Sequence, residues 1–584
     1  MRQMLATRFL TVLALALGAC GSDDSTEATS GSAGQTGSSG AAGGGSAGFG
    51  GSTAGSGGSA AGGAAGTSGA PMVGGAAGAG GTAGSSGGGA AGSGGSGGGT
   101  GATGGTGTGG TAAQTWVSFL GGSDFEQARD VAVDPQGNIV VVGGTRSKNF
   151  PVTAGAYDTT FASGGSALGN GGPMDVFVAK LSPTGKLLWA TYVGGPNYDR
   201  AYAVETDAKG DIYVGGRAGQ QFPTTPGVLQ PSFAGDNTVN ALYGPQDGFV
   251  LKLSSDGKQL IWSTYFGGPG REFLRDLAVD ATGATYPGLA AVGPGFPHVT
   301  LGAFDTSHNG GYDNAVAKLS ADGKTLVWGT YLGGSKDESP PSVRIHSSGQ
   351  VYVGGGSSSA NMPVTAGAFQ SKLAGGFDYY FARLSSDGKT LHACTYYGGT
   401  GNENTETHTL AIDPQGNAVF GAVTLSPDLP MTLGALQPAR KGTADAFVAK
   451  MSPNGNTLVA ATYLGGNSTD GIQGVAVDSA GNVYVGGTTS SADLPVTANA
   501  YQSKHGGGID AWAARLSPGL SQITYLTYLG GPADDEGRSL WIDASGNIAS
   551  IGQSASQALP TTPGAFQSKY AGGTDDAFVA RFVP

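Results

Sequence analysis

Apolar and polar residues alternate in short segments along this chain, and turn residues separate the segments. The pattern is clearest in four segments that follow one another: 474–478, 483–487, 510–516 and 523–529. Each predicts a β-strand, because β-branched and aromatic residues recur at alternate positions. Residues 479–482, Ser-Ala-Gly-Asn, predict a tight turn, since Gly and Asn tolerate positive φ. Four strands joined by turns predict one antiparallel sheet.

The same unit recurs along the chain and is marked by the phrase Thr-Tyr-Leu-Gly-Gly or a close variant. Its copies begin at Ser118, Thr191, Thr264, Thr330, Thr395, Thr462 and Thr527. Subtraction gives intervals of 73, 73, 66, 65, 67 and 65 residues. Seven copies of one unit predict one architecture built by repetition, not seven independent domains.

Stacking the copies around an axis would cover both faces of every sheet. This predicts an all-β, seven-bladed β-propeller with four-stranded antiparallel blades. The competing architecture, a β-solenoid, usually has a far shorter repeat without four separate strands. The last repeat ends in a third strand, 577–583, whereas the first repeat begins with an orphan fourth strand, 115–120. We therefore expect these two segments to pair and close the ring.

The repeated phrases also resemble a known family. They are Val-Ala-Val-Asp-x-x-Gly-Asn-Val-Tyr-Val-Gly-Gly, Leu-Pro-Val-Thr, Asp-Ala-Phe-Val-Ala-Lys-Leu-Ser-Pro and Thr-Tyr-Leu-Gly-Gly. Together they resemble the SBBP family, named for its seven-bladed β-propeller repeats, over residues 115–584. The resemblance implies a propeller fold and an exported location, and it brings no catalytic residues.

Some repeats depart from the common pattern. Pro287 is expected to break the second strand of the third repeat, and His346 replaces an aspartate found in the other repeats. The first two repeats have longer loops, at about 146–174 and 218–246. Loops that differ between copies are where a repeated scaffold can carry a specific site.

The longer loops supply the candidate ligand-binding residues, Phe161, Phe233 and Tyr243. We interpret these apolar groups as additions to the loop that all repeats share. The alternative is a disordered Gly-rich excursion, because both loops are also rich in Gly, Ser and Asn.

A carboxylate follows each Gly-Gly pair by four positions. The seven residues are Glu126, Asp199, Glu272, Glu338, Glu403, Asp470 and Asp535. A ring of carboxylates near the axis could hold Ca²⁺ or attract cations. Alternatively, each acid accepts backbone N–H bonds in its own loop or ties one blade to the next. The second interpretation is favoured, because scaffolding needs the same group in every blade whereas a ligand site needs different ones.

Other constellations carry little chemistry. The six histidines show no metal-binding spacing, and no nucleophile elbow is present. Cys394 stands where other repeats have a small residue, so it is expected to be a packed side chain. We therefore expect no cofactor and no catalytic residue.

The first 114 residues have a different composition. Residues 21–114 are nearly all Gly, Ser, Ala and Thr, without Lys or Arg, which predicts a flexible linker. Its typical reach would be about 50 Å. Residues 1–20 predict a signal peptide, with Arg2 and Arg8 before a short apolar run.

The signal ends in Leu17-Gly18-Ala19-Cys20, which resembles the lipobox of bacterial lipoproteins. The resemblance implies that Cys20 carries acyl chains such as palmitate and becomes the mature first residue. The second mature residue would be Gly21 rather than Asp, which by resemblance to lipoprotein sorting rules implies the outer membrane or cell surface. The alternative is an ordinary secretory signal with an accidental cysteine.

These observations predict an envelope lipoprotein whose propeller, 115–584, is a non-enzymatic binding or scaffold module. Its partner would be an unknown protein or glycan, it would meet membrane only through the anchor, and we expect a monomer. The net charge of −12 argues against nucleic acid. The alternative is an extracytoplasmic polysaccharide lyase or hydrolase. An enzyme should cluster acids, bases or His in one or two blades, whereas a scaffold should scatter its departures.

Overall fold

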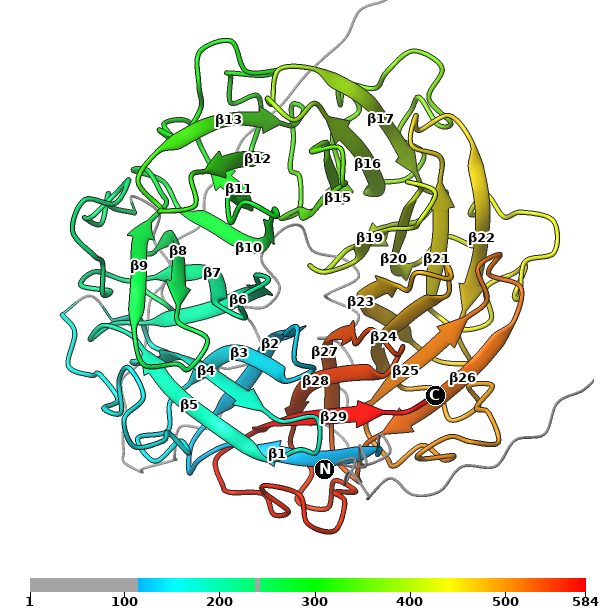
Figure 1. Ribbon diagram of the computed structural model, residues 1–584. Helices are drawn as coiled ribbons and strands as arrows, with labels where there is room; N and C mark the ends of the chain where they lie inside the picture. Colours follow the sequence, from blue (N-terminus) through cyan, green and yellow to red (C-terminus); the bar gives the residue numbers. More distant parts are fainter. Residues whose placement is uncertain (1–113, 167, 237–241) are drawn as a thin grey trace, which may run out of the picture. The chain divides into compact units, whose positions relative to one another are not determined.

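Seven sheets surround a common axis in the computed structural model, which describes residues 114–166, 168–236 and 242–584 (Figure 1). The fold is an all-β, seven-bladed propeller with four-stranded antiparallel blades, as the sequence predicts. The described ranges contain no helix that is long and apolar enough to cross a membrane.

The strands fall into four rings from the axis outward. The innermost strands are β2 (Glu126–Val133), β6 (Asp199–Thr206), β10 (Glu272–Val279), β14 (Ser342–Ile345), β18 (Glu403–Asn404) with β19 (Leu410–Ile412), β23 (Asp470–Val477) and β27 (Asp535–Ile542). The second strands are β3 (Ile139–Thr145), β7 (Ile212–Ala218), β11 (Thr285–Val292), β15 (Val351–Ser357), β20 (Ala418–Thr424), β24 (Val483–Thr489) and β28 (Ile548–Ser554). The third strands are β4 (Asp175–Leu181), β8 (Asp247–Leu253), β12 (Tyr312–Leu319), β16 (Asp378–Leu384), β21 (Asp445–Met451), β25 (Asp510–Leu516) and β29 (Asp576–Phe582). The outer strands are β5 (Leu187–Val193), β9 (Leu260–Tyr265), β13 (Leu326–Leu332), β17 (Leu391–Tyr397), β22 (Leu458–Leu464), β26 (Ile523–Leu529) and β1 (Trp116–Leu120).

Blade seven joins the two ends of the propeller. Strand β1 pairs antiparallel with β29, with Trp116 opposite Arg581 and Leu120 opposite Ala577 (Figure 1). Gln567 strengthens the junction: its backbone N–H donates to Ser118 Oγ at 3.0 Å, and its side-chain oxygen accepts from Gly121 N. The predicted closure is therefore confirmed.

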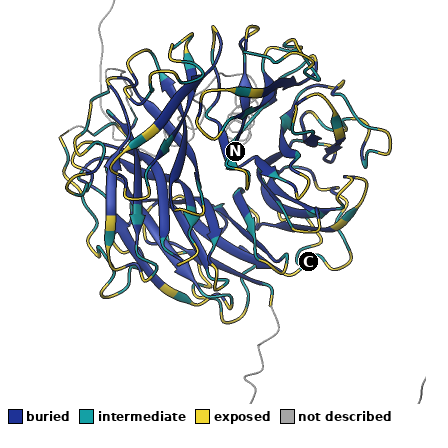
Figure 2. Ribbon diagram, turned by 45° about the horizontal axis from the view of Figure 1, so that its top comes forward, coloured by how far each residue is buried: buried dark blue, intermediate teal, exposed yellow. Residues whose placement is uncertain are grey.

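The core lies between neighbouring blades rather than within one. One buried cluster joins Val140 and Val142 of blade one to Val204 and Val214 of blade two. Figure 2 shows the strands as largely buried ribbons and the connecting loops as the exposed parts. Each sheet gains cover only from its neighbours, so stability depends on the complete ring.

The two local departures are smaller than predicted. Pro287 lies inside continuous strand β11 and opposite Leu277 of β10, so the expected break is wrong. Its missing N–H affects only the other side, where pairing with β12 skips from Thr285 to Gly288. His346 keeps the turn of the aspartate it replaces, because its Nδ1 lies 2.8 Å from Ser348 Oγ.

Deleting residues 115–122 should destabilise the whole propeller, because it exposes the edge of β29 and opens the ring. Deleting residues 25–110 removes none of the described strands and should leave the melting temperature unchanged. Circular dichroism melts of the two deletions and the parent test this. Equal melting temperatures for the 115–122 deletion and the parent would refute it.

Candidate functional site

The seven repeated acids are buried and serve their own blades. In six of them, one carboxylate oxygen accepts the N–H of the second Gly of the preceding pair, as between Gly122 and Glu126 at 2.8 Å. A hydroxyl at the end of the second strand also donates in five blades, as Thr145 does to Glu126 at 2.6 Å. The acids therefore fasten the start of each innermost strand, which supports the favoured scaffolding interpretation.

A second buried carboxyl lies beside each of these acids. It is the aspartate at or near the start of the third strand of the preceding blade, which accepts a backbone N–H from its own loop. The pair converges on the first Gly of Gly-Gly. A Cβ on Gly121 would lie 2.7 Å from Asp576 Cγ and 2.8 Å from Glu126 Oε2, so no side chain fits there. The repeated Gly-Gly phrase thus leaves room for two carboxyl groups.

Burial is the main reason why the pKa values of these carboxyl groups are raised. It raises the pKa of Glu126 to about 7 and that of Asp199 to about 7. Burial raises the pKa of Asp175 to about 9, and the neighbouring Asp199 charge adds to the effect. Within the described ranges, no group of three or more His, Cys, Asp or Glu is arranged to hold a metal ion. Cation binding by the seven acids stays an untested prediction.

Blade five departs from the other blades at the axis. Asp413 follows the repeated acid Glu403 by ten positions, whereas Asp478 of blade six follows Asp470 by eight. The extra length divides the innermost strand into β18 and β19 and carries His408 in a left-handed conformation, φ 67°. The histidine is buried, with 3% of its surface exposed.

His408 reaches three other blades. Its Nε2 lies 2.9 Å from the carbonyl oxygen of Tyr202, and its Nδ1 lies 3.6 Å from Asp130 and 3.4 Å from Asp276. Asp276 also accepts from Arg344 Nη1 at 2.8 Å. Burial disfavours the charged imidazole, but Asp130 and Asp276 outweigh it and raise the pKa of His408. We call these residues the axial plug, because they join blades one to five across the axis.

An arginine-rich region lies on blades one to three, nearer the Gly-Gly ends of the strands. Four guanidinium carbons lie over the Tyr202 ring, at 4.3 Å for Arg275, 4.6 Å for Arg129, and 5.2 Å for both Arg200 and Arg217. Arg217 also donates to Tyr202 Oη at 2.7 Å. All four arginines are buried. Together with Arg271, which lies just before β10, they form what we call the arginine cluster.

β-Bulges place much of this cluster. The pairing between first and second strands skips one residue at Arg129, Tyr202 and Arg275, as it does at the matching Gln473 and Arg538 of blades six and seven. A bulged residue has no ladder partner, and bulges commonly re-aim a side chain beside a functional site. Arg271, just before β10, pairs with Asp236 at 3.0 Å and lies 5.8 Å from the Phe273 ring.

The extended loops of blades one and two have the same kind of insertion. In both loops, the backbone N–H that donates to the third-strand aspartate belongs to a residue thirteen positions before it: Ala162 before Asp175, and Ala234 before Asp247. In blade six the donor, Gly506, is only four positions before its aspartate. The added residues therefore follow Ala162 and Ala234. In blade two they include Tyr243, which is buried against Tyr198 and Arg217, with centroid distances of 4.6 Å in both contacts.

The other two ligand candidates precede the insertions. Phe161 lies edge-on to Tyr192 at 5.9 Å, and Phe233 lies edge-on to Tyr265 at 5.8 Å. His505 holds the same relation to its repeat tyrosine, Tyr528, at 5.6 Å. Phe161 and Phe233 thus occupy a position shared between blades, contrary to the expectation that the added segments supply them. Ligand contact by Phe161, Phe233 and Tyr243 remains a prediction.

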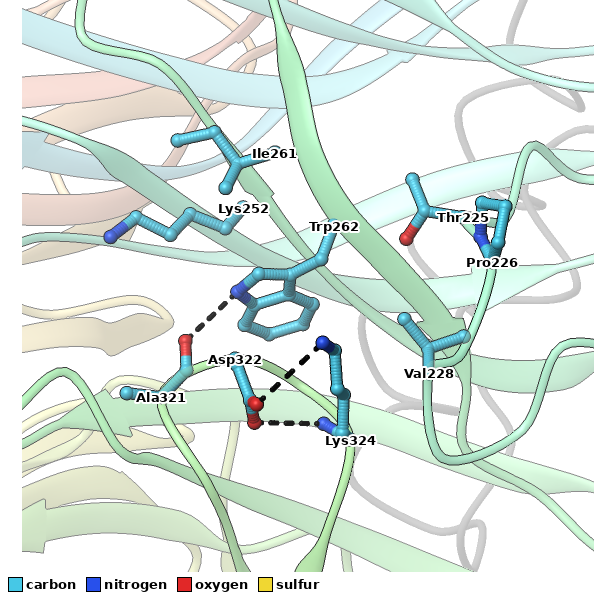
Figure 3. A pocket seen from close by; sticks show the side chains of 9 residues that line it. All are labelled: Thr225, Pro226, Val228, Lys252, Ile261, Trp262, Ala321, Asp322 and Lys324. Atoms are coloured by element: carbon cyan, nitrogen blue, oxygen red, sulfur yellow. Dashed lines mark hydrogen bonds and ion pairs between the residues drawn. The ribbon is translucent and has the colours of Figure 1, made fainter.

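A pocket of about 500 Å³ opens between blades two and three, at the outer strands (Figure 3). Trp262 of β9 lines it and donates from Nε1 to the Ala321 carbonyl oxygen at 3.0 Å. The same tryptophan-to-turn contact recurs at Trp116, Trp189 and Trp328. Gly323, with φ +68°, leaves space for the Trp262 ring. The pocket therefore follows from the repeat.

Comparison with known proteins identifies the repeat unit. A family model described as SBBP, β-propeller repeat, matches residues 461–495. Those residues form the Gly-Gly turn, β23 and β24 of one four-stranded blade. Residues 461–495 are therefore an SBBP β-propeller repeat, and the other blades repeat the same sheet.

The individual proteins that the chain resembles are distant. Regulatory protein FlaEY of Caulobacter vibrioides is 25% identical over 302 residues, which span 49% of this chain and 29% of that protein. A protein of unknown function from Dyadobacter fermentans has 14% identity and a TM-score of 0.35, covering 65% of this chain and 95% of its own. The WD40 propeller of Doa1 has 11% identity and a TM-score of 0.39, covering 80% and 97%. Polysaccharide lyase Uly1 has 8% identity and a TM-score of 0.39, covering 79% and 90%.

The axial plug and the arginine cluster were not among the candidates from sequence. The ten-residue spacing in blade five is a signal that could have pointed to His408. For the arginines, the signal is weaker: Arg129 and Arg275 occupy the third position after the repeated acid, where Gln473 stands in blade six. Repeat alignment gives these positions, but it does not show that the side chains converge.

The buried carboxyls predict that the propeller loses stability as pH rises from 5 to 8. Burial raises the pKa of Glu403 to about 7 and that of Asp470 to about 6, so the folded state binds these protons more tightly than the unfolded state. Their stabilisation is complete below about pH 4 and is lost as pH rises through 6 to 7. Each pKa unit is worth about 1.4 kcal/mol. Urea unfolding at pH 5 and pH 8 measures the loss.

Two variants test whether the buried carboxyls cause this pH dependence of stability. Glu403→Gln should flatten the pH dependence, whereas exposed Asp428→Asn should not. Hydrogen bonding from Thr400 lowers the pKa of Asp428, so that group titrates outside this window. Equal free energies of unfolding for the parent at pH 5 and pH 8 would contradict the prediction.

The axial plug predicts a large cost for His408→Gln. Removing the charge leaves Asp130 without its buried cation, and breaking a buried ion pair typically costs about 3–5 kcal/mol. Adding Asp130→Asn should recover part of the loss, while exposed His392→Gln should change little. Denaturant unfolding of the three variants gives the values. Additive losses in the double variant would show that the two residues are not coupled.

Proposed function

We propose that this chain is an exported, lipid-anchored propeller that acts as a non-enzymatic binding or scaffold module at the cell envelope. One observation carries the binding role: the departures around Tyr202 on blades one to three are arginines and aromatic side chains beside the two inserted loops, not the cluster of acids and histidines in one or two blades that an enzyme would need. A repeated scaffold with one differentiated region is suited to hold a specific partner. The partner would be a protein or a glycan.

The envelope location rests on the sequence. Cys20 and the segment 21–113 lie outside the described residues, so the anchor and the tether stay proposals. The lipobox-like Leu17-Gly18-Ala19-Cys20 supports them, and the Gly- and Ser-rich composition of the following segment suits a tether.

An enzyme is the second candidate, of the polysaccharide lyase or hydrolase type. One observation favours it: Tyr202 is buried under four arginines, with its backbone carbonyl 2.9 Å from His408 Nε2. Burial tends to raise the pKa of Tyr202, but the charges of Arg200, Arg217, Arg275 and Arg129 together lower it. A tyrosine of lowered pKa can serve as a general base.

The soluble 114–584 propeller, screened on glycan and protein arrays, tests the proposal. We expect saturable binding to one class of partner with no turnover. Cleavage of the bound polysaccharide would replace the binding proposal with the enzyme. No binding to any partner would contradict both candidates.

Shortening either inserted loop should abolish binding of the partner found on the arrays. The segments to remove are 163–172 in blade one and 235–244 in blade two, because they follow the shared aspartate contact. Affinity and melting temperature should be measured together. The loss of affinity should exceed any loss of stability, and unchanged affinity in both variants would place the site elsewhere.

Cys20→Ser should leave the protein unlipidated and no longer held by membranes. Two acyl chains make membrane attachment stable where one is marginal. Cell fractionation followed by immunoblotting measures the distribution. Continued recovery of Cys20→Ser with membranes would show that something other than an acyl anchor retains it.

A further inference from the structure

One position of the innermost strands departs from the repeat in three blades. It is the second residue before the aspartate, or in blade four the histidine, that opens the turn to the second strand. In four blades it is a buried alanine: Ala132, Ala278, Ala411 and Ala476. Blades two, four and seven have Glu205, Arg344 and Trp541 there, and all three are half-buried. Since alanine suffices for the ring, the three larger side chains indicate a specific role.

These three side chains meet across the axis, although blades two, four and seven are not neighbours (Figure 1). The guanidinium carbon of Arg344 lies 5.8 Å from the centre of the Trp541 ring. The charge of Arg344 is also the largest influence that lowers the pKa of Glu205, so the two groups lie near each other. We call Glu205, Arg344 and Trp541 the turn-side cluster.

The turn-side cluster has polar groups without a partner in the described chain. The other five tryptophans donate from Nε1 to backbone carbonyl oxygens: Trp116, Trp189, Trp262, Trp328 and Trp512. Within the described residues, neither the Trp541 N–H nor the Glu205 carboxyl makes a hydrogen bond. A tryptophan N–H away from bulk water usually finds an acceptor. The cluster thus presents an indole N–H and a carboxyl group to what enters from solvent.

We propose that the turn-side cluster is a saccharide-binding site. A sugar unit has an apolar C–H face, which packs on an aromatic ring, and hydroxyl groups that both donate and accept. Arg344 and the Trp541 N–H supply donors, and the Glu205 carboxyl supplies an acceptor. The inference goes beyond the proposed function, because the inserted loops follow the second strands and so lie at the opposite, Gly-Gly end of the blades.

The axial plug holds the turn-side cluster in place from behind. Arg344 Nη1 donates to Asp276 at 2.8 Å and to the Val343 carbonyl oxygen at 2.7 Å. Asp276 in turn lies 3.4 Å from His408 Nδ1. A guanidinium that is already fixed loses less entropy when a ligand binds.

The state of Glu205 also suits a neutral ligand. Burial raises the pKa of Glu205 to about 8, although the charge of Arg344 lowers it in part. The carboxyl is therefore mostly protonated at neutral pH, and it can donate to a hydroxyl as well as accept from one. A protonated carboxyl offers no charge to a cation.

Calorimetric titration of three trisaccharides into the full chain carrying Cys20→Ser tests the inference. The probes are cellotriose, chitotriose and trigalacturonate, which separate plain, acetamido and acidic sugars. We expect saturable binding of at least one. No saturable binding of any of them would overturn the inference, as would a chain that binds only proteins on the arrays.

The repeat itself supplies the variants. Trp541→Ala and Glu205→Ala each restore the residue that four other blades have, and each should weaken binding by at least about tenfold. Glu205→Gln should bind within about threefold of the parent, because the amide is neutral and keeps a donor and an acceptor. Ile261→Ala, in the pocket at the outer strands, is the control and should bind as the parent does. Weaker binding by Ile261→Ala with unchanged binding by Trp541→Ala would contradict the assignment.

Melting temperatures separate binding from packing. Trp541 also packs against the core between blades seven and one, so Trp541→Ala can lose stability. Trp541→Phe keeps an aromatic ring and removes only the N–H, so it should melt near the parent temperature and bind more weakly. Equal affinities for the parent, Trp541→Phe and Glu205→Ala would overturn the inference.

The loop-shortened variants distinguish this site from the proposed one. Removing 163–172 or 235–244 should leave trisaccharide affinity unchanged. An array partner lost in those variants, with no trisaccharide bound by the parent, would leave the proposed function standing and remove this inference. Trisaccharide binding that is lost in Trp541→Ala, with an array partner unaffected by loop shortening, would do the reverse.

Discussion

The buried carboxyl at the start of each innermost strand is the interaction on which the rest of the ring depends. It accepts the N–H of the preceding Gly, in most blades accepts a hydroxyl from the second strand, and lies beside an aspartate of the previous blade. The first Gly is required because two carboxyl groups occupy the place of its side chain. One repeated contact therefore explains the Gly-Gly phrase, the position of the acid and the junction between blades.

Because the repeat provides the scaffold, specific roles fall to its departures. They are concentrated: two extra residues in blade five carry His408 across the axis, and the arginines of blades one to three surround Tyr202. Both groups bury charges. His408 is balanced by Asp130 and Asp276, Arg271 is paired with Asp236, and the charges of the other arginines lower the pKa of Tyr202. The plug therefore contributes to stability.

The sequence was sufficient to predict the blades, their number and their closure, because alternation and a fixed repeat specify local structure and its copies. It also supported the scaffolding role of the acids, since every copy has one. It could not predict the convergence at Tyr202, because the bulged residues that meet there are 73 residues apart in sequence, and a shared position in the repeat does not show which side chains contact one another. Phe161 and Phe233 were misplaced in the added segments because loop length alone did not reveal where each insertion begins.

The most direct test compares the melting temperatures of variants that remove a repeated acid, Asp199→Ala and Asp535→Ala, with that of a variant at an exposed acid, Asp428→Ala. The account predicts that each variant of a repeated acid lowers the melting temperature of the whole propeller, whereas Asp428→Ala changes it little. Equal melting temperatures for the repeated-acid variants and the parent would contradict the account.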